Sequence, residues 1–436
     1  MFSNKQSWYF IGIGGVSMSA LAQLLHSRGA NVSGSDAVES SFTQKLVSLG
    51  IPVSIGDNGY IYADNVVYTG AIEENQKQLK AAREAGKRLL SRAELLGMVA
   101  EEYPHTISVA GCHGKTSTTS MLSHIFASGN RAFACHIGGE DLDFGNYYST
   151  GGEYFITEAC EFRRSFLSLN SEIAVILNTD RDHTDCYASE AELVEAYRLF
   201  ANHAQKVVVN ADDIHARNFT HALSFGLHAG DIQAENLQSE GEKYTFTVTE
   251  HGIPVERISL KTVGKYQICN ALAAFAAARL AGFTPSEIKC GLENFHGVKR
   301  RFEEVGYIHG VPMICDYAHH PREILASFSS AQRLCRGTVR LVFQPHTFTR
   351  TRDLMSEFVS VLKKAENPLI YKTYAAREKF DFKGSAVALV SRLPEASYVQ
   401  SPEDLRVRLE QEVEAGDLVL VLGAGDIYDI AKSICD

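Results

Sequence analysis

Short runs of apolar residues alternate with segments of helical periodicity along most of this 436-residue chain. That alternation is typical of parallel β-sheets flanked by α-helices, since one parallel strand follows another only through a long crossover, usually a helix. The chain is therefore predicted to have an α/β fold. In its first part the predicted strands are 8–13, 31–35, 51–55 and 66–69, and the predicted helices are 16–28 and 92–99.

The same alternation divides the chain into three units, as expected for its length at roughly 150 residues per domain. The second unit is predicted to contain antiparallel hairpins as well as parallel strands. Its strands are predicted at 106–110, 154–157, 173–177 and 207–209, its helices at 115–128 and 270–280, and its hairpins within 234–260. The strands of the third unit are predicted at 313–315, 339–343, 369–371 and 418–422. The expected domains are 1–96, 97–296 and 297–436.

Charge and cysteine content narrow the range of functions. The net charge of −10 argues against nonspecific nucleic-acid binding, which depends on Lys and Arg neutralising phosphates. The nine cysteines are scattered and never spaced as CxxC, which favours reduced thiols over a disulfide framework. Residues 1–10 lack a secretory pattern, and no apolar stretch reaches membrane-spanning length. We expect a cytoplasmic protein with no nucleic-acid or membrane partner.

The strongest local signal is AGCHGKT at 110–116, between a predicted strand and a predicted helix. Glycines allow backbone N–H groups to converge on phosphate oxygens, and the helix N-terminus adds a favourable dipole. In such a turn Lys115 would reach the terminal phosphates, and the Thr116 hydroxyl would ligate magnesium. Val109 stands where the full eight-residue pattern has glycine, so an ordinary helix start is the alternative interpretation.

Two later segments place polar groups directly after predicted strands, where ligands of open α/β sheets bind. They are TEACE at 157–161 and NTDRDHTD at 178–185. Glu158 is a candidate ligand for a magnesium ion shared with the nucleotide, and His183, if neutral, for a second ion. A structural histidine in a solvated acidic loop is the alternative, because imidazole is not the donor that magnesium prefers.

A second glycine-rich turn, GIGGVS at 12–17, also lies between a predicted strand and a predicted helix, with Asp36 near the end of the next strand. It is similar to a dinucleotide-binding fingerprint, but the sixth position is Ser17 rather than Gly or Ala, which weakens an NAD interpretation. The turn is therefore either a nucleotide-binding turn or an ordinary tight connection between a strand and a helix.

Cationic candidates cluster in the third unit. His346 and Arg350 follow the predicted strand 339–343, and His319 and His320 stand at the start of a predicted helix. Positive groups there suit a carboxylate or a developing acyl phosphate. Surface cations and helix caps are the alternative interpretation.

Taken in order, these motifs resemble those of the Mur ligases. The resemblance covers nearly the whole chain: GGVSMS at 14–19, GCHGKT at 111–116, EACE at 158–161 with SFL at 165–167, DHTD at 182–185, RRFE at 300–303, DYAHHP at 316–321, FQPHTFTRT at 343–351 and GAGD at 423–426. One such motif can mislead, whereas so many in the same order support one another. The GGVSM opening and the DYAHHP and FQPHTFTRT pair are similar to the alanine-adding member of the family.

The resemblance implies a ligase that uses ATP and Mg²⁺ to join L-alanine to UDP-N-acetylmuramate. It implies a Rossmann-like N-terminal domain for the UDP-sugar, a central P-loop ATPase-like domain with a mixed sheet, and a Rossmann-like C-terminal domain for the amino acid. The implied nucleotide-binding residues are Gly111, His113, Gly114, Lys115, Thr116, Ser117, Asn270 and Arg301. The implied metal ligands are Thr116, Glu158 and His183. The implied substrate-binding residues are Gly14, Gly15, Ser17, Met18, Asp36, Thr69, His319, His346 and Arg350.

Some positions depart from the family pattern. Cys112 stands where the family usually has Thr, and the acidic DESD-like run becomes CEFR at 160–163. The HNxxN motif expected near adenine is YQICN at 266–270, which keeps only Asn270. Because of these changes, the affinity for the nucleotide and the preference for adenine are not implied by the resemblance.

The implied reaction has two steps, in which Lys115, Glu158, His183, His346 and Arg350 would act. The sugar's carboxylate attacks the γ-phosphoryl of ATP to give an acyl phosphate, and the amine of alanine then displaces phosphate. Rival hypotheses are an NAD-dependent dehydrogenase, a sibling ligase that attaches a preformed peptide to the same sugar, and a nucleotide-binding regulator without activity. A monomer or weak homodimer is expected.

Overall fold

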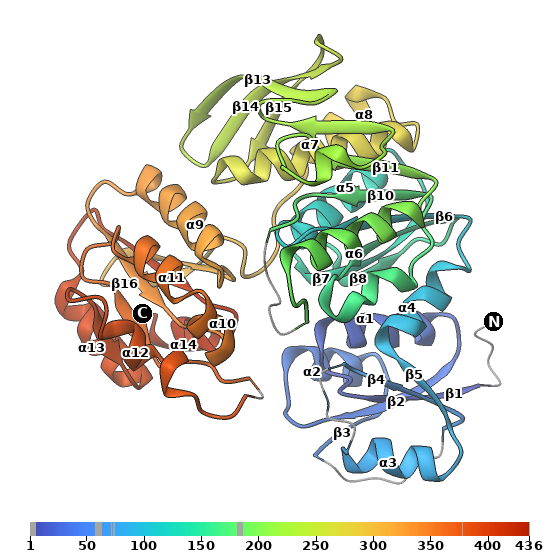
Figure 1. Ribbon diagram of the computed structural model, residues 1–436, viewed down its shortest axis with the longest axis horizontal. Helices are drawn as coiled ribbons and strands as arrows, with labels where there is room; N and C mark the ends of the chain where they lie inside the picture. Colours follow the sequence, from blue (N-terminus) through green and yellow to red (C-terminus); the bar gives the residue numbers. More distant parts are fainter. Residues whose placement is uncertain are drawn as a thin grey trace.

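The computed structural model describes residues 6–56, 63–70, 72, 75–180, 186–376 and 378–435. Within them it contains three α/β domains, each built around its own sheet. Figure 1 shows the first domain (blue) below the central domain (cyan to yellow), with the third domain (orange to red) to one side. The predicted fold class is therefore confirmed.

The first domain has a five-stranded, wholly parallel sheet in the order β3-β2-β1-β4-β5. Its strands are β1 (Ser7–Ile11), β2 (Asn31–Asp36), β3 (Val53–Ile55), β4 (Asn65–Tyr68) and β5 (Arg88–Ser91). Its helices are α1 (Val16–Ser27), α2 (Ser41–Ser48), α3 (Lys77–Glu84) and α4 (Arg92–Ala100). Gly29 ends α1 with a φ of +83°, a conformation that glycine adopts without strain.

The central domain has a ten-stranded mixed sheet in the order β15-β14-β13-β12-β11-β10-β6-β9-β7-β8. Its strands are β6 (His105–Ala110), β7 (Phe133–Asp141), β8 (Gly145–Ser149), β9 (Tyr154–Ala159), β10 (Ile173–Ile176), β11 (Lys206–Asn210), β12 (Leu223–Gly226), β13 (Ile232–Glu240), β14 (Lys243–Glu250) and β15 (Ile253–Lys261). The predicted antiparallel hairpins are β13 to β15. Its helical segments are α5 (Lys115–Ser128), η1 (Phe162–Ser168), α6 (Glu190–Asn202), η2 (Ala216–Asn218), α7 (Lys265–Leu280) and α8 (Pro285–Glu293).

The third domain has a six-stranded sheet in the order β16-β17-β21-β18-β19-β20, parallel except for β16. Its strands are β16 (Glu303–Ile308), β17 (Val311–Asp316), β18 (Val339–Phe343), β19 (Leu369–Tyr371), β20 (Ser397–Val399) and β21 (Leu418–Leu422). Its helical segments are α9 (Pro321–Leu334), α10 (Phe348–Asp353), α11 (Met355–Leu362), η3 (Phe382–Gly384), α12 (Ala386–Val390), α13 (Pro402–Glu412) and α14 (Ile427–Ile434). No helix of the described chain is long and apolar enough to cross a membrane.

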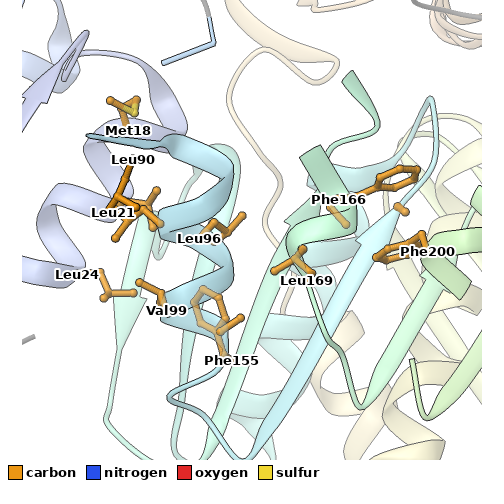
Figure 2. Packing of buried hydrophobic residues seen from close by; sticks show 14 of the residues in the cluster. Met18, Leu21, Leu24, Leu90, Leu96, Val99, Phe155, Phe166, Leu169 and Phe200 are labelled. Atoms are coloured by element: carbon orange, nitrogen blue, oxygen red, sulfur yellow. The ribbon is translucent and has the colours of Figure 1, made fainter. Parts of the chain in front are cut away.

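A continuous hydrophobic cluster joins the first domain to the central one. Figure 2 shows Leu21 and Leu24 of α1 near Leu96 and Val99 of α4, with Phe155 of β9 beside them. All five side chains are almost fully buried. Burying each contributes roughly 1.5–3 kcal/mol, so the first two domains are held together as one packed body. The third domain has clusters of its own.

Candidate active site

The AGCHGKT turn connects β6 to α5, as its sequence predicts. Gly111 and Gly114 have φ angles of +144° and +86°, which favour glycine. A Cβ at Gly114 would lie 2.4 Å from Oδ1 of Asn270, and one at Gly111 would lie 2.9 Å from Cβ of Leu177. Both glycines are therefore required by close packing as well as by backbone conformation.

Lys115 follows this turn and is held by a buried carboxylate. Its Nζ donates to Glu161 at 2.9 Å and to the carbonyl oxygens of Gly111 and Cys112. Burial alone would lower the pKa of Lys115, but Glu161, Cys160 and Cys112 together outweigh burial and raise that pKa above its ordinary value. The lysine is thus a permanent cation beside the turn, where a phosphate would bind.

Glu158 completes this centre from the end of β9. Its carboxylate accepts from the backbone N–H of Gly138 at 2.6 Å and from the Thr116 hydroxyl. Burial raises the pKa of Glu158, while the nearby Lys115 opposes that rise. A buried carboxylate beside a hydroxyl is an oxygen donor set that fits Mg²⁺. His183, the other predicted metal ligand, lies outside the described residues.

A cavity of about 270 Å³ lies beside the turn, between the central and third domains. Gly114, Ser117 and Asn270 line it from the central domain, and Arg301 and Asp316 from the linker and the third domain. Asn270 donates to Oε1 of Gln267 at 3.0 Å. Of the residues expected to bind the nucleotide, His113, Gly114, Ser117, Asn270 and Arg301 line this cavity, whereas Gly111, Lys115 and Thr116 do not.

Asp316 in this cavity gives a pH-dependent prediction. Burial raises its pKa to about 6, against the smaller opposing effect of Arg301. A carboxyl with a raised folded-state pKa favours folding while protonated, and this advantage is lost as pH rises through about 6. We expect Asp316→Asn to gain stability relative to wild type between pH 4 and pH 7, on the order of 2 kcal/mol, in unfolding titrations. A difference independent of pH would contradict this.

Glu323 of α9 links the third domain to the phosphate turn. Its Oε1 lies 2.9 Å from Nδ1 of His113, and its Oε2 accepts from the backbone N–H groups of His319 and His320. Although burial opposes it, the charges of His319, His113 and Arg301 hold the pKa of Glu323 well below its usual range. Arg322 forms a second link to Asp180 of the central domain.

Glu323→Gln is therefore expected to loosen the docking of the third domain. The amide still caps α9 but loses the charge that pairs with His113, a loss of roughly 1–3 kcal/mol. X-ray scattering should show a larger radius of gyration without nucleotide. Glu287→Gln is the matched control, because Glu287 caps α8 in the same way through Thr284. Equal scattering of both variants would refute the link.

His346 and Arg350 lie together next to His319, as predicted. Nη1 of Arg350 donates to the carbonyl oxygen of His346 at 2.9 Å, and the rings of His346 and His319 are 6.0 Å apart. Burial, with help from the charges of His319 and Arg350, lowers the pKa of His346 to about 3. Burial thus favours the neutral imidazole of His346, and Arg350 is the permanent cation of this pair.

A larger cleft of about 770 Å³ lies between the first and central domains. Gly15, Ser17, Met18 and Thr69 line it on one side, and Glu158 reaches it from the other. The cleft therefore connects the second glycine-rich turn with the Lys115 and Glu158 centre. Ser17 contacts the ring of His136 at 2.8 Å, and burial lowers the pKa of that histidine to about 3, leaving it neutral.

Gly14 and Asp36 bond to each other. Oδ2 of Asp36 accepts from the backbone N–H of Gly14 at 2.8 Å, and a Cβ at Gly14 would lie 2.9 Å from that oxygen. Asp36 thus braces the turn, and its predicted contact with substrate stays a prediction.

Comparison with known proteins places this geometry in a family. Residues 7–104 match the model described as "Mur ligase family, catalytic domain", residues 109–278 the Mur ligase middle domain, and residues 300–425 the "Mur ligase, glutamate ligase domain". A UDP-N-acetylmuramate--L-alanine ligase of Lachnospira eligens is 38% identical, over 99% of this chain and 98% of that protein. The chain belongs to the Mur ligase family.

Other relatives agree with this assignment. The UDP-N-acetylmuramate--L-alanine ligase of Clostridium novyi is 37% identical over 98% of this chain and 97% of its own length. The crystal structure of a UDP-N-acetylmuramate-alanine ligase from Thermotoga maritima has a TM-score of 0.86, with 24% identity and 98% of each chain covered. A murein peptide ligase from Psychrobacter arcticus has a TM-score of 0.76 at 22% identity, again over 98% of each chain. These two structures show the shared fold.

Some residues of this Mur ligase site were not singled out from the sequence. Glu323 stands three residues after His320 with a proline between, a capping pattern that predicts a helix start but not a partner 210 residues away. Asn178 accepts from the backbone N–H of His113 at 3.0 Å and donates to its carbonyl, so it shapes the phosphate turn. Its position just after β10 could have predicted a site residue, because ligands bind at the carboxyl ends of strands in such sheets.

Proposed function

We propose that this Mur ligase joins L-alanine to the carboxylate of UDP-N-acetylmuramate and converts ATP to ADP and phosphate, in peptidoglycan precursor synthesis. One observation carries the proposal. Glu158 lines the large cleft and is bonded to Thr116 of the phosphate turn, beside Lys115. A sugar acid in the cleft and a triphosphate on the turn would thus meet at one charged centre. The full-length relatives named as this ligase support the choice of substrates.

The first step requires two anions to approach each other. The sugar's carboxylate attacks the γ-phosphorus of ATP, the bond to the β-phosphate oxygen breaks, and acyl phosphate and ADP result. Lys115 neutralises charge on the transferring phosphoryl group, and backbone N–H groups of the turn hold the other phosphates. Mg²⁺ held by Thr116 and Glu158, and by His183 as the family resemblance implies, would neutralise further charge when bound.

The second step requires alanine to be held beside the acyl phosphate. Arg350 would pair with the alanine carboxylate, while the neutral His346 and the adjacent His319 orient the amine by hydrogen bonding. The amine attacks the acyl carbon, phosphate leaves, and the amine loses a proton. Docking of the third domain through Glu323 would exclude water, which would otherwise hydrolyse the acyl phosphate.

A direct assay tests this function. The protein is incubated with UDP-N-acetylmuramate, ATP and Mg²⁺, amino acids are added singly, and phosphate release and product mass are followed. Product and phosphate are expected with L-alanine. A product only with an added tripeptide would indicate the sibling peptide-adding reaction, and ATP binding without phosphate release would indicate a regulator.

We also propose a cytoplasmic location and domain boundaries at 96/97 and 296/297. All nine cysteines are free, which suits a reducing compartment. The three sheets span 7–91, 105–261 and 303–422, and both boundaries fall between them, although Leu96 lies within α4. The expected monomer or weak homodimer stays a prediction.

A further inference from the structure

Two consecutive arginines occupy a segment that is acidic in the family pattern. Arg163 and Arg164 lie in η1, between Glu161 and the SFL sequence, and their φ angles are +51° and +56°. The proposed reaction gives neither residue a role. The two arginines differ in their contacts with carboxylates, and this difference indicates a role for Arg163.

Within the described part of the chain, Arg164 has a carboxylate partner and Arg163 has none. Nη2 of Arg164 lies 2.8 Å from a carboxylate oxygen of Glu192 on α6. Nη1 of Arg163 donates to the carbonyl oxygen of Gly70 at 3.2 Å, and the described residues offer Arg163 no ion pair. A guanidinium has five N–H donors, so most of its capacity to bind an anion is unused.

Arg163 also lies in the right part of the large cleft. Gly70, which it contacts, follows Thr69, and Cγ2 of Thr69 is only 2.7 Å from where a Cβ on Gly12 would be. Arg163 therefore extends from the central domain to a loop that packs against the second glycine-rich turn.

The cleft contains few positive charges. Among its described lining residues the permanently charged cations are Arg92, Arg163 and Arg164, and Arg164 is already paired. The charge of Arg92 acts on His136 and Cys160, which also line the cleft. The glycine-rich turn itself has no basic side chain, and one of its N–H groups is used by Asp36. Arg163 and Arg92 are therefore the described cations that could pair with a diphosphate held there, and Arg163 is the one that bonds to the loop beside the turn.

We propose that Arg163 binds the diphosphate of the nucleotide-sugar, as a specificity-determining residue that replaces an acidic position of the family pattern. This inference rests on the proposed function for its ligand class. The planar guanidinium fork matches two phosphate oxygens, and a contact of this kind distinguishes a diphosphate ester from an uncharged sugar.

Calorimetric titration tests the proposal with two ligands that share the diphosphate but differ in the carboxylate. UDP-N-acetylmuramate has both groups, and UDP-N-acetylglucosamine lacks the carboxylate. Arg163→Gln is expected to weaken both by the same factor, about 10- to 100-fold. Arg163→Lys should recover part of the loss. Arg164→Gln is the matched control and should change either affinity less than about threefold, because Glu192 neutralises Arg164.

The outcomes separate this inference from the proposed function. Unchanged affinities in Arg163→Gln would overturn the inference, and so would a loss confined to UDP-N-acetylmuramate, which would place Arg163 at the carboxylate. An unchanged ATP affinity and melting temperature show that the variant is folded. If wild type forms no alanine product but Arg163→Gln still weakens both ligands equally, the proposed function fails and the inference stands. Failure of wild type to bind either ligand overturns both.

Discussion

Lys115→Ala is expected to abolish ligation, with kcat/KM falling by about 10³-fold or more. Lys115 is the only Lys or Arg of the 110–116 turn, and its charge acts on Glu158, where the two anions of the proposed reaction would meet. Losing one charged contact to a transferring phosphoryl group in a buried site typically reduces the rate by two to three powers of ten or more. Phosphate release with saturating UDP-N-acetylmuramate and L-alanine measures the effect.

The buried ion pair between Lys115 and Glu161 means that Lys115→Ala needs a control for stability. Removing the lysine leaves without its partner a carboxylate whose side chain is 0% exposed, so Lys115→Ala is expected to lose stability as well as activity. Breaking such a pair costs about 3–5 kcal/mol. The double variant Lys115→Met with Glu161→Gln removes both charges and should recover most of the stability without recovering activity. Near-normal turnover in either variant would refute the phosphate-binding role.

Glu158→Gln is the second change with a large expected effect. The amide still accepts from Gly138 but cannot neutralise a metal ion, so kcat/KM should fall by about 10²-fold or more, and Mg²⁺ should no longer strengthen ATP binding. Activity assays and ATP titrations with and without EDTA measure both. Glu153→Gln is the control, because Glu153 is exposed just before β9 begins.

The same variant should be more stable than wild type when metal is absent. Burial raises the pKa of Glu158, so its charged form destabilises the fold as pH rises through that pKa. Glutamine removes this penalty, and the melting temperature in EDTA at pH 8 should equal or exceed that of wild type. A lower melting temperature together with lost activity would instead indicate a structural residue.

The sequence predicted the parts of the fold that depend on local pattern. The β6 strand, the glycine turn and α5 were predicted almost to the residue, since apolar periodicity and glycine chemistry act over a few positions. The β7–β8 hairpin was missed, because Gly138 and Gly139 interrupt its pattern. The start of α7 was placed at Asn270 instead of Lys265, because residues 266–270 were interpreted as a motif and not as a helix.

From the sequence, the site could be predicted only for side chains that lie at or just after the ends of strands. Thr116 and Glu158 follow neighbouring parallel strands, so the strand-end rule brings them together. No local rule predicts that Glu323 contacts His113, because that contact depends on how two domains dock. Nor does sequence show that burial would neutralise His346 or that Asp36 would bind Gly14.

The unequal way in which the three domains are joined has a consequence for the catalytic cycle. Separating the first two would expose leucine and phenylalanine side chains to water, whereas α9 contacts His113 and Asp180 of the central domain through charged groups that water can solvate instead. Under the proposed function, we expect residues 303–435 to move about one hinge so that the nucleotide enters and ADP leaves, while the first two domains, which would hold the nucleotide-sugar, move as one body. Because residues of α9 line the nucleotide cavity, a small molecule bound under α9 would arrest turnover by competing with ATP and not with the nucleotide-sugar.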